Sequence, residues 1–212
     1  MNFKPVLFKI MLFSLVIFSG CEKDRETENI STITYFPTIQ LNGDQWNTIK
    51  QGGAWSDQGA TANEGESSIN LITTGSVDVN TPGVYTIQYT AINKDGFSAS
   101  EYRYIGVISP SVEGKDISGQ YKRNAGALGV STVTKISDNF YYSNNVGGVA
   151  VPDPSLGVYF YHYDTGLLDV PFQRTPGNAF ECLNETITEG EKYSWVVINS
   201  GYGAALRTFI KQ

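Results

Sequence analysis

Apolar and polar positions alternate along two neighbouring stretches of the chain, residues 84–91 and 102–108. A period of two places successive side chains on opposite faces of a strand, so each stretch predicts a β-strand with two distinct faces. Lys94-Asp95-Gly96 lies between them, and glycine accepts a positive φ at no steric cost, which predicts a hairpin turn. No segment has a convincing helical apolar period, so we expect an all-β protein.

A second series of short apolar stretches, separated by polar turns, follows residue 116. The candidate strands are Gly119–Arg123, Val130–Ile136, Phe140–Ser143, Gly157–Tyr163, Leu168–Gln173, Tyr193–Asn199 and Leu206–Lys211. This series predicts an antiparallel barrel or sandwich over residues 116–212. Pro, Gly and charge gather in residues 109–115, which predicts a linker after a first domain over residues 33–108.

The first twenty residues have the three parts of a secretory signal: Lys4 and Lys9, an apolar run at 10–18, and small residues at 19 and 20. The apolar run is shorter than the roughly 20 residues that a membrane-spanning helix needs. Phe-Ser-Gly-Cys at 18–21 resembles a bacterial lipobox. The resemblance implies that residues 1–20 are removed and that Cys21 carries a lipid that holds the chain to the membrane. The alternative is an ordinary signal peptide with an incidental Cys21.

Residues 21–32 are polar and charged, and they cannot bury apolar area, so they predict a flexible tether. The formal net charge of the chain is −6 and no basic patch stands out, which argues against nucleic acid as a partner. The second cysteine, Cys182, is a lone thiol if Cys21 carries lipid. We expect it to be a small buried hydrophobe.

Residues 81–87, Thr-Pro-Gly-Val-Tyr-Thr-Ile, resemble the approach to strand F of an immunoglobulin sandwich. Tyr85 stands where the tyrosine-corner residue would be, and Ile87 takes the place of the cysteine of antibody domains. The resemblance implies an immunoglobulin-like sandwich over residues 33–108, with an aliphatic core contact in place of the disulfide.

Four short motifs extend this resemblance to the bacterial immunoglobulin-like domain that recurs in cell-surface proteins. They are Pro-x-Ile-x-Leu from Pro37, Asp-x-Gly-Ala-x-Ala from Asp57, Gly-x-Tyr-x-Ile-x-Tyr from Gly83, and the Asp-Gly turn at Asp95. Such domains usually act as spacers or stalks. No acidic partner lies at calcium-loop spacing around Asp57, so we expect it to make local hydrogen bonds.

The layout of the whole chain resembles two-domain Bacteroidetes-type cell-surface lipoproteins, in which a C-terminal β domain of unassigned function follows the immunoglobulin-like domain. Gly-x-Tyr-x-Arg at Gly119 and Ser-Trp-x-Val at Ser194 carry this resemblance. It implies a lipid-anchored protein in the outer membrane, exposed on the cell surface. It also suggests an outer-membrane transport complex as a candidate partner.

Residues 158–163, Val-Tyr-Phe-Tyr-His-Tyr, place three tyrosines on one face of a predicted strand. Sugars bind by stacking their apolar C–H faces on aromatic rings while polar groups contact their hydroxylated edges. The candidate glycan-binding residues are Tyr159, Tyr161, Tyr163, Tyr141 and Trp46. The alternative is that these tyrosines line the inner face of a small barrel or pair across strands.

The sequence contains little that indicates catalysis. His162 is the only histidine, no Gly-x-Ser-x-Gly elbow accompanies it, and no phosphate loop or dinucleotide fingerprint is present. We therefore expect no catalytic residue, no metal and no cofactor, and we predict a protein that binds extracellular polysaccharide. The alternatives are a structural or protein-docking module of a surface complex and, more distantly, a carboxylate-dependent glycoside hydrolase.

Overall fold

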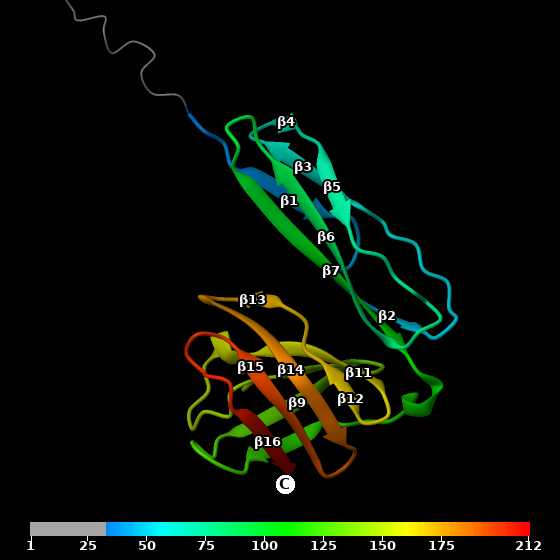
Figure 1. Cartoon of the computed structure of the whole chain (residues 1–212), viewed down its shortest axis with the longest axis vertical. Coiled ribbons are helices and arrows are strands. Elements are labelled where there is room, and N and C mark those ends of the chain that lie inside the picture. The colour runs from blue at the N-terminus through cyan, green and yellow to red at the C-terminus, as the bar shows by residue number, and fades with distance from the viewer. Residues whose placement is uncertain (1–32) are drawn as a thin grey trace, which may run out of the picture. The chain divides into compact units, whose positions relative to one another are not determined.

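Figure 1 shows the computed structural model, which describes residues 33–212. The predicted signal peptide, Cys21 and the predicted tether therefore lie outside the described residues. Tyr35–Gln212 form one compact unit. This unit is built from strands and two short 3₁₀ turns, which confirms the all-β prediction. Among the described residues, no helix has the length and apolarity to cross a membrane.

Two sheets form the immunoglobulin-like sandwich. One has the order β1–β3–β4, and the other has the order β2–β7–β6–β5 with β2 parallel to β7. The strands are β1 (Pro37–Leu41), β2 (Trp46–Lys50), β3 (Ala60–Glu64), β4 (Ser67–Ser68), β5 (Leu71–Thr74), β6 (Gly83–Ile92) and β7 (Ser98–Ile108). The core between the sheets centres on Ile87, Tyr89 and Ile105. The predicted hairpin is the β6–β7 pair, and Gly96 in its turn has a φ of +87°.

The tyrosine corner is present as predicted. The Tyr85 hydroxyl donates to the Thr81 carbonyl at 2.9 Å, and Ile87 is buried two residues later. This bond anchors the start of β6 to the loop before it, as the corner does in immunoglobulin domains.

Asp57 makes the expected local bond and a long-range contact as well. It accepts from the backbone N–H of Gly59 at 3.2 Å and from the Tyr89 hydroxyl at 2.5 Å, and it pairs with the buried Arg103. Burial alone would raise the pKa of Asp57, but the bonds from Tyr89 and Gly59 and the Arg103 charge bring it below its usual value. The negative charge of Asp57 therefore compensates the positive charge of the buried Arg103 guanidinium.

The C-terminal part is an antiparallel barrel, which decides between the two predicted architectures. Its strand order is β12–β11–β10–β9–β8–β16–β15–β14–β13, and a β12–β14 pairing closes the ring. The strands are β8 (Gly119–Arg123), β9 (Val130–Ser137), β10 (Phe140–Ser143), β11 (Val158–Asp164), β12 (Leu167–Asp169), β13 (Gln173–Thr175), β14 (Asn178–Thr188), β15 (Lys192–Ile198) and β16 (Leu206–Lys211). Phe160, Trp195 and Phe209 lie in its core.

The prediction for residues 168–188 was wrong in two respects. The single strand predicted at 168–173 is split between β12 and β13, and the sequence pattern missed the long strand β14. Within β14 the register shifts between Leu183 and Thr186, and Asn184 takes a φ of +57°. Such a bulge breaks the alternation of apolar and polar residues, which is the signal that identifies a strand.

The sandwich and the barrel pack against each other through a domain-contact cluster. Its buried members are Tyr104, Ile108, Val112, Phe140 and Tyr161. Val112 belongs to a 3₁₀ turn, η2 (Pro110–Val112), inside the predicted linker. The linker is also tied to the barrel, since the Ser109 N–H donates to the Tyr163 carbonyl at 2.8 Å.

Candidate functional site: an aromatic cleft

Strand β11 separates its side chains as the sequence predicts. Val158 and Phe160 point into the barrel core, while Tyr159, Tyr161 and Tyr163 belong to the domain-contact cluster on the outside of the barrel. The tyrosine row therefore does not line the inner face of the barrel. It faces the immunoglobulin-like sandwich, which the alternation of the strand alone could not reveal.

Tyr161 and Tyr141 have no exposed surface. The Tyr161 hydroxyl donates to the Asn47 carbonyl at 3.0 Å, across the domain contact. Tyr141 lies in the barrel core, and its hydroxyl donates to the Lys115 carbonyl at 3.0 Å. In this structure neither ring offers a face on which a sugar could stack, because neighbouring side chains cover both.

Trp46 and Tyr159, two further candidates, line a cleft of about 450 Å³ where the sandwich meets the barrel. Trp46 begins strand β2, in a stretch that the sequence analysis had not assigned to a strand. Tyr102, Tyr142 and Phe172 also line this cleft, and they are not among the five candidates listed from the sequence. Tyr163 packs on the domain-contact cluster but does not line the cleft.

The rings of the cleft form a continuous series. Ring centroids are 5.1 Å apart from Tyr142 to Tyr159, 5.3 Å from Tyr159 to Trp46, and 4.3 Å from Trp46 to Tyr104. The series continues over 6.4 Å from Tyr104 to Tyr102. These separations lie within or just below the range of about 4.5–7 Å that is typical of attracting aromatic pairs, so the rings support each other's orientation.

Gln173 fixes the position of Tyr159. This buried side chain accepts from the Tyr159 N–H at 2.7 Å and donates to the Tyr159 carbonyl at 2.7 Å. The amide thus satisfies both backbone groups of Tyr159, as a neighbouring strand would. Phe172, next to Gln173, contributes its backbone carbonyl as the acceptor for the Tyr104 hydroxyl, which joins this wall of the cleft to the sandwich.

Polar and charged side chains also line the cleft: Gln45, Glu101, Arg174 and Thr175. The Arg174 guanidinium lies 5.9 Å from the centroid of Tyr102 and 5.7 Å from that of Phe172. A guanidinium over aromatic rings gains from their negative faces and keeps its N–H groups at the edge. The cleft therefore combines apolar ring faces with hydrogen-bonding groups.

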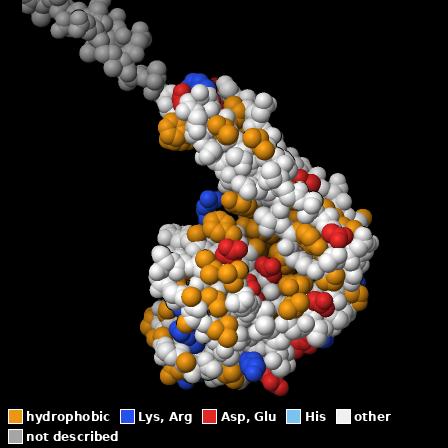
Figure 2. All heavy atoms as spheres, in the orientation of Figure 1, with side chains coloured by type: hydrophobic (Ala, Val, Ile, Leu, Met, Phe, Trp, Pro, Cys, Tyr) orange, Lys and Arg blue, Asp and Glu red, His pale blue; other side chains and the backbone are white. Residues whose placement is uncertain are grey.

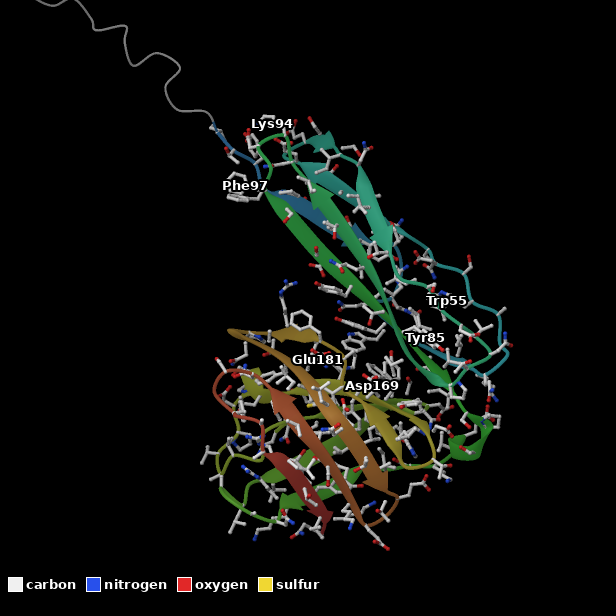
Figure 3. The ribbon with its side chains drawn as sticks, viewed as in Figure 1. Trp55, Tyr85, Lys94, Phe97, Asp169 and Glu181 are labelled. Carbon is white, nitrogen blue, oxygen red and sulfur yellow. The ribbon has the colours of Figure 1, made fainter. Side chains whose placement is uncertain are left out.

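Three carboxylates that sequence analysis did not single out lie near one another on the barrel. Burial first, and then the charges of Glu185 and Glu181, raise the pKa of Asp169 to about 7. Figure 3 labels Asp169 on β12 and Glu181 on β14, and Figure 2 shows acidic side chains beside hydrophobic ones next to a recess in the surface. Tyr161 faces Asp169 across the β11–β12 pair, so this carboxyl lies on the tyrosine face of the sheet.

His162 and Cys182 are both buried and do not line the cleft. His162 Nε2 lies 3.4 Å from a Glu189 carboxylate oxygen, and burial lowers the pKa of the imidazole. Cys182 belongs to the barrel core, as expected of a lone thiol, and burial raises its pKa. Among residues 33–212, no group of three or more His, Cys, Asp or Glu side chains is arranged to hold a metal ion.

Comparison with known proteins bears on the first part of the chain. Residues 39–107 match the bacterial surface protein, Ig-like domain family. The match covers strands β1 to β7 almost completely, and it agrees with the sandwich and the tyrosine corner. It supports a cell-surface location and a non-catalytic module.

The other comparisons are more distant. The crystal structure of the lipoprotein BT2262 from Bacteroides thetaiotaomicron is 23% identical, with a TM-score of 0.37, and the match covers 84% of this chain and 100% of that one. No curated protein matches the chain. The family match therefore identifies the type of the first domain and leaves the ligand open.

Proposed function

We propose that the protein is a lipid-anchored cell-surface protein of the outer membrane that binds extracellular polysaccharide in the aromatic cleft. The observation that supports this best is the series of rings from Tyr142 through Tyr159 and Trp46 to Tyr102. Five of the lining rings keep part of their surface exposed: Trp46, Tyr102, Tyr142, Tyr159 and Phe172.

The chemistry of the cleft suits a sugar chain. The apolar C–H face of a pyranose stacks on an aromatic ring, and its equatorial hydroxyls bond with polar groups at the ring's edge. Gln45, Arg174 and Thr175 line the same cleft, with Glu101 as an acceptor for hydroxyl protons. A volume near 450 Å³ is within the usual range for small-ligand sites and would take a short stretch of polysaccharide.

A glycan-array screen with the lipid-free chain tests the proposal, followed by titration of any glycan that binds. Tyr142→Ala and Phe172→Ala each remove a cleft ring, and we expect each to weaken binding about 2- to 12-fold, corresponding to ~0.5–1.5 kcal/mol per stacked ring. Tyr163→Ala is the matched control, because Tyr163 shares the β11 face and does not line the cleft. Equal losses in all three variants, or no binding to any glycan, would refute the assignment.

A structural or protein-docking module is the second candidate. It is supported by the burial of Tyr104 and Tyr161 between sandwich and barrel, where they hold the two parts together instead of meeting a ligand. On this view the cleft would receive a protein segment of a surface complex, such as an outer-membrane transport complex. A photo-crosslinker at position 142 distinguishes the candidates, since it would attach to a protein partner in cells while the purified chain binds no glycan.

A further inference from the structure

The turn end of the β6–β7 hairpin carries an exposed apolar patch, which we name the tip patch. It consists of Tyr35, Phe36, Ile92 and Phe97, whose exposed fractions are 52%, 63%, 51% and 46%. Figure 3 labels Phe97 at this end of the sandwich, next to Lys94. Single exposed apolar residues are common on proteins, but here Phe36 contacts Phe97 and Asn93 ties Tyr35 to the same turn, so apolar side chains from separate segments gather at one end of the sandwich.

The tip patch is held in a defined arrangement. The Phe36 and Phe97 rings meet edge to face with centroids 4.9 Å apart. Asn93, which is buried, donates from Nδ2 to the Tyr35 carbonyl at 2.8 Å and accepts from the Phe97 N–H at 2.7 Å. One side chain thus ties the entering segment to the turn, so that the apolar rings project from a braced frame.

Charged groups of both signs border the tip patch. The Lys94 ammonium lies 3.2 Å from a Glu64 carboxylate oxygen and 2.9 Å from an Asp95 carboxylate oxygen. Apolar rings surrounded by paired charges match the bilayer interface, where acyl chains give way to charged headgroups. Tyrosine favours this region because its ring is apolar and its hydroxyl is polar, and phenylalanine rings bury apolar area at the boundary of the acyl chains.

We propose that the tip patch rests in the interfacial layer of the membrane to which the chain is anchored. This inference relies on the lipid anchor at Cys21 in the proposed function. Tyr35 follows Cys21 by 14 positions in the sequence. A chain of that length spans at most roughly 50 Å, and a flexible one averages about 20 Å. The tip patch is therefore confined close to the bilayer, where burial of its rings costs little additional chain entropy.

This contact would also set the position of the aromatic cleft. Tyr102 lies on β7, which begins at Ser98, and it follows Phe97 by five positions, which corresponds to at most roughly 17 Å of extended chain. A tip patch held at the interface would fix this distance and limit tumbling of the anchored protein. The cleft would then face the extracellular space in a restricted set of orientations.

Depth-dependent quenching tests the inference. The lipidated full chain carrying Phe97→Trp is reconstituted into phosphatidylcholine vesicles with and without brominated acyl chains, and mass spectrometry first verifies the lipid on Cys21. Leu206→Trp is the control, because Leu206 is 56% exposed on barrel strand β16, outside the tip patch. We expect bromolipid to remove the emission added by Phe97→Trp and to leave that added by Leu206→Trp.

Three results would overturn the inference. The first is equal quenching of the two added tryptophans. The second is a tryptophan at position 97 that is shielded from aqueous acrylamide but untouched by bromolipid, which would indicate a second copy or another protein on the tip patch. The third is an unmodified Cys21, which removes the anchor. Glycan binding by the lipid-free chain is measured separately, so failure of the cleft assignment cannot be confused with failure of the membrane contact.

Discussion

Gly106 on β7 packs directly against the Tyr161 ring of the barrel. A Cβ at this position would lie 2.5 Å from Cδ1 and 2.7 Å from Cε1 of the Tyr161 ring. Carbon atoms in contact prefer separations of about 3.5–4.0 Å. Tyr161 cannot simply move away, since it is fully buried and bonded to the Asn47 carbonyl. Gly106→Ala must therefore push the two parts apart or strain the ring.

The structure sets the size of the expected effect. Relief of the overlap requires a displacement of about 1 Å in a packed contact, and overpacking of this kind costs about 1–3 kcal/mol. The backbone contributes in the opposite direction. Replacing Gly with Ala at a compatible φ lowers the conformational entropy of the unfolded chain, which stabilises the folded protein by about 0.4–1 kcal/mol. We expect a net destabilisation of about 1–2 kcal/mol.

Urea unfolding followed by tryptophan fluorescence measures this effect. Trp46 packs against the domain-contact cluster, Trp55 against the sandwich core and Trp195 in the barrel core, so the three fluorophores report on all three regions. Gly83→Ala is the matched control, because its Cβ would lie 3.7 Å from the nearest Tyr85 ring atom, an ordinary contact. It should be neutral or slightly stabilising.

A double-mutant cycle separates steric overlap from other causes. In a Tyr161→Ala background the space beside position 106 is free, so Gly106→Ala should lose most of its cost and give a coupling energy of about 1–2 kcal/mol. A Gly106→Ala variant as stable as the Gly83→Ala variant, or a coupling energy near zero, would mean that β7 and Tyr161 do not pack as described.

Three further predictions concern buried titratable groups. Asp169→Asn should stabilise the protein on the order of 2–4 kcal/mol at pH 8 and give no gain near pH 4, as measured by urea unfolding. The folded state holds the Asp169 proton up to about pH 7, whereas the unfolded chain releases it near pH 4. The free energy of unfolding of the unmodified protein therefore falls as the pH rises from about 4 to about 7. His162 makes stability depend on pH in the opposite direction. Its pKa is lowered by burial, so stability should fall as the pH drops below about 6.5, and His162→Phe should flatten this loss in acid-unfolding curves. Cys182 should resist iodoacetamide at pH 8 until urea unfolds the barrel, as mass spectrometry would show, because burial raises its pKa and blocks access. Rapid labelling of the folded chain would contradict its place in the core.

Local signals made the first domain predictable. The β6–β7 hairpin rests on a period of two and on a glycine in the turn, and the tyrosine corner links Tyr85 to a carbonyl four positions earlier. Each of these features involves residues that are close in sequence. Strand β14 escaped prediction because its bulge at residues 183–186 disrupts the same periodic signal.

The candidate site depended on contacts that are distant in sequence. Trp46 and Tyr159 were predicted as ligand-binding residues, and the structure brings them together from strands that lie more than 100 positions apart. Tyr102, Tyr142 and Phe172 join them, although no motif marked the three as one group. Their common role follows from the packing of β7 against the barrel, which a pattern within one strand does not encode.

By itself, the sequence determined the all-β class, the immunoglobulin-like hairpin and the two faces of β11. The tertiary structure decided which of those faces meets solvent. Alternation shows that Tyr159, Tyr161 and Tyr163 share one face, but whether each ring is buried or exposed depends on what packs opposite it. Gly106 of the sandwich comes close enough to cover Tyr161, whereas Tyr159 lies at the edge of the contact and opens into the cleft. One row of identical side chains is thereby divided between the core and a candidate binding surface.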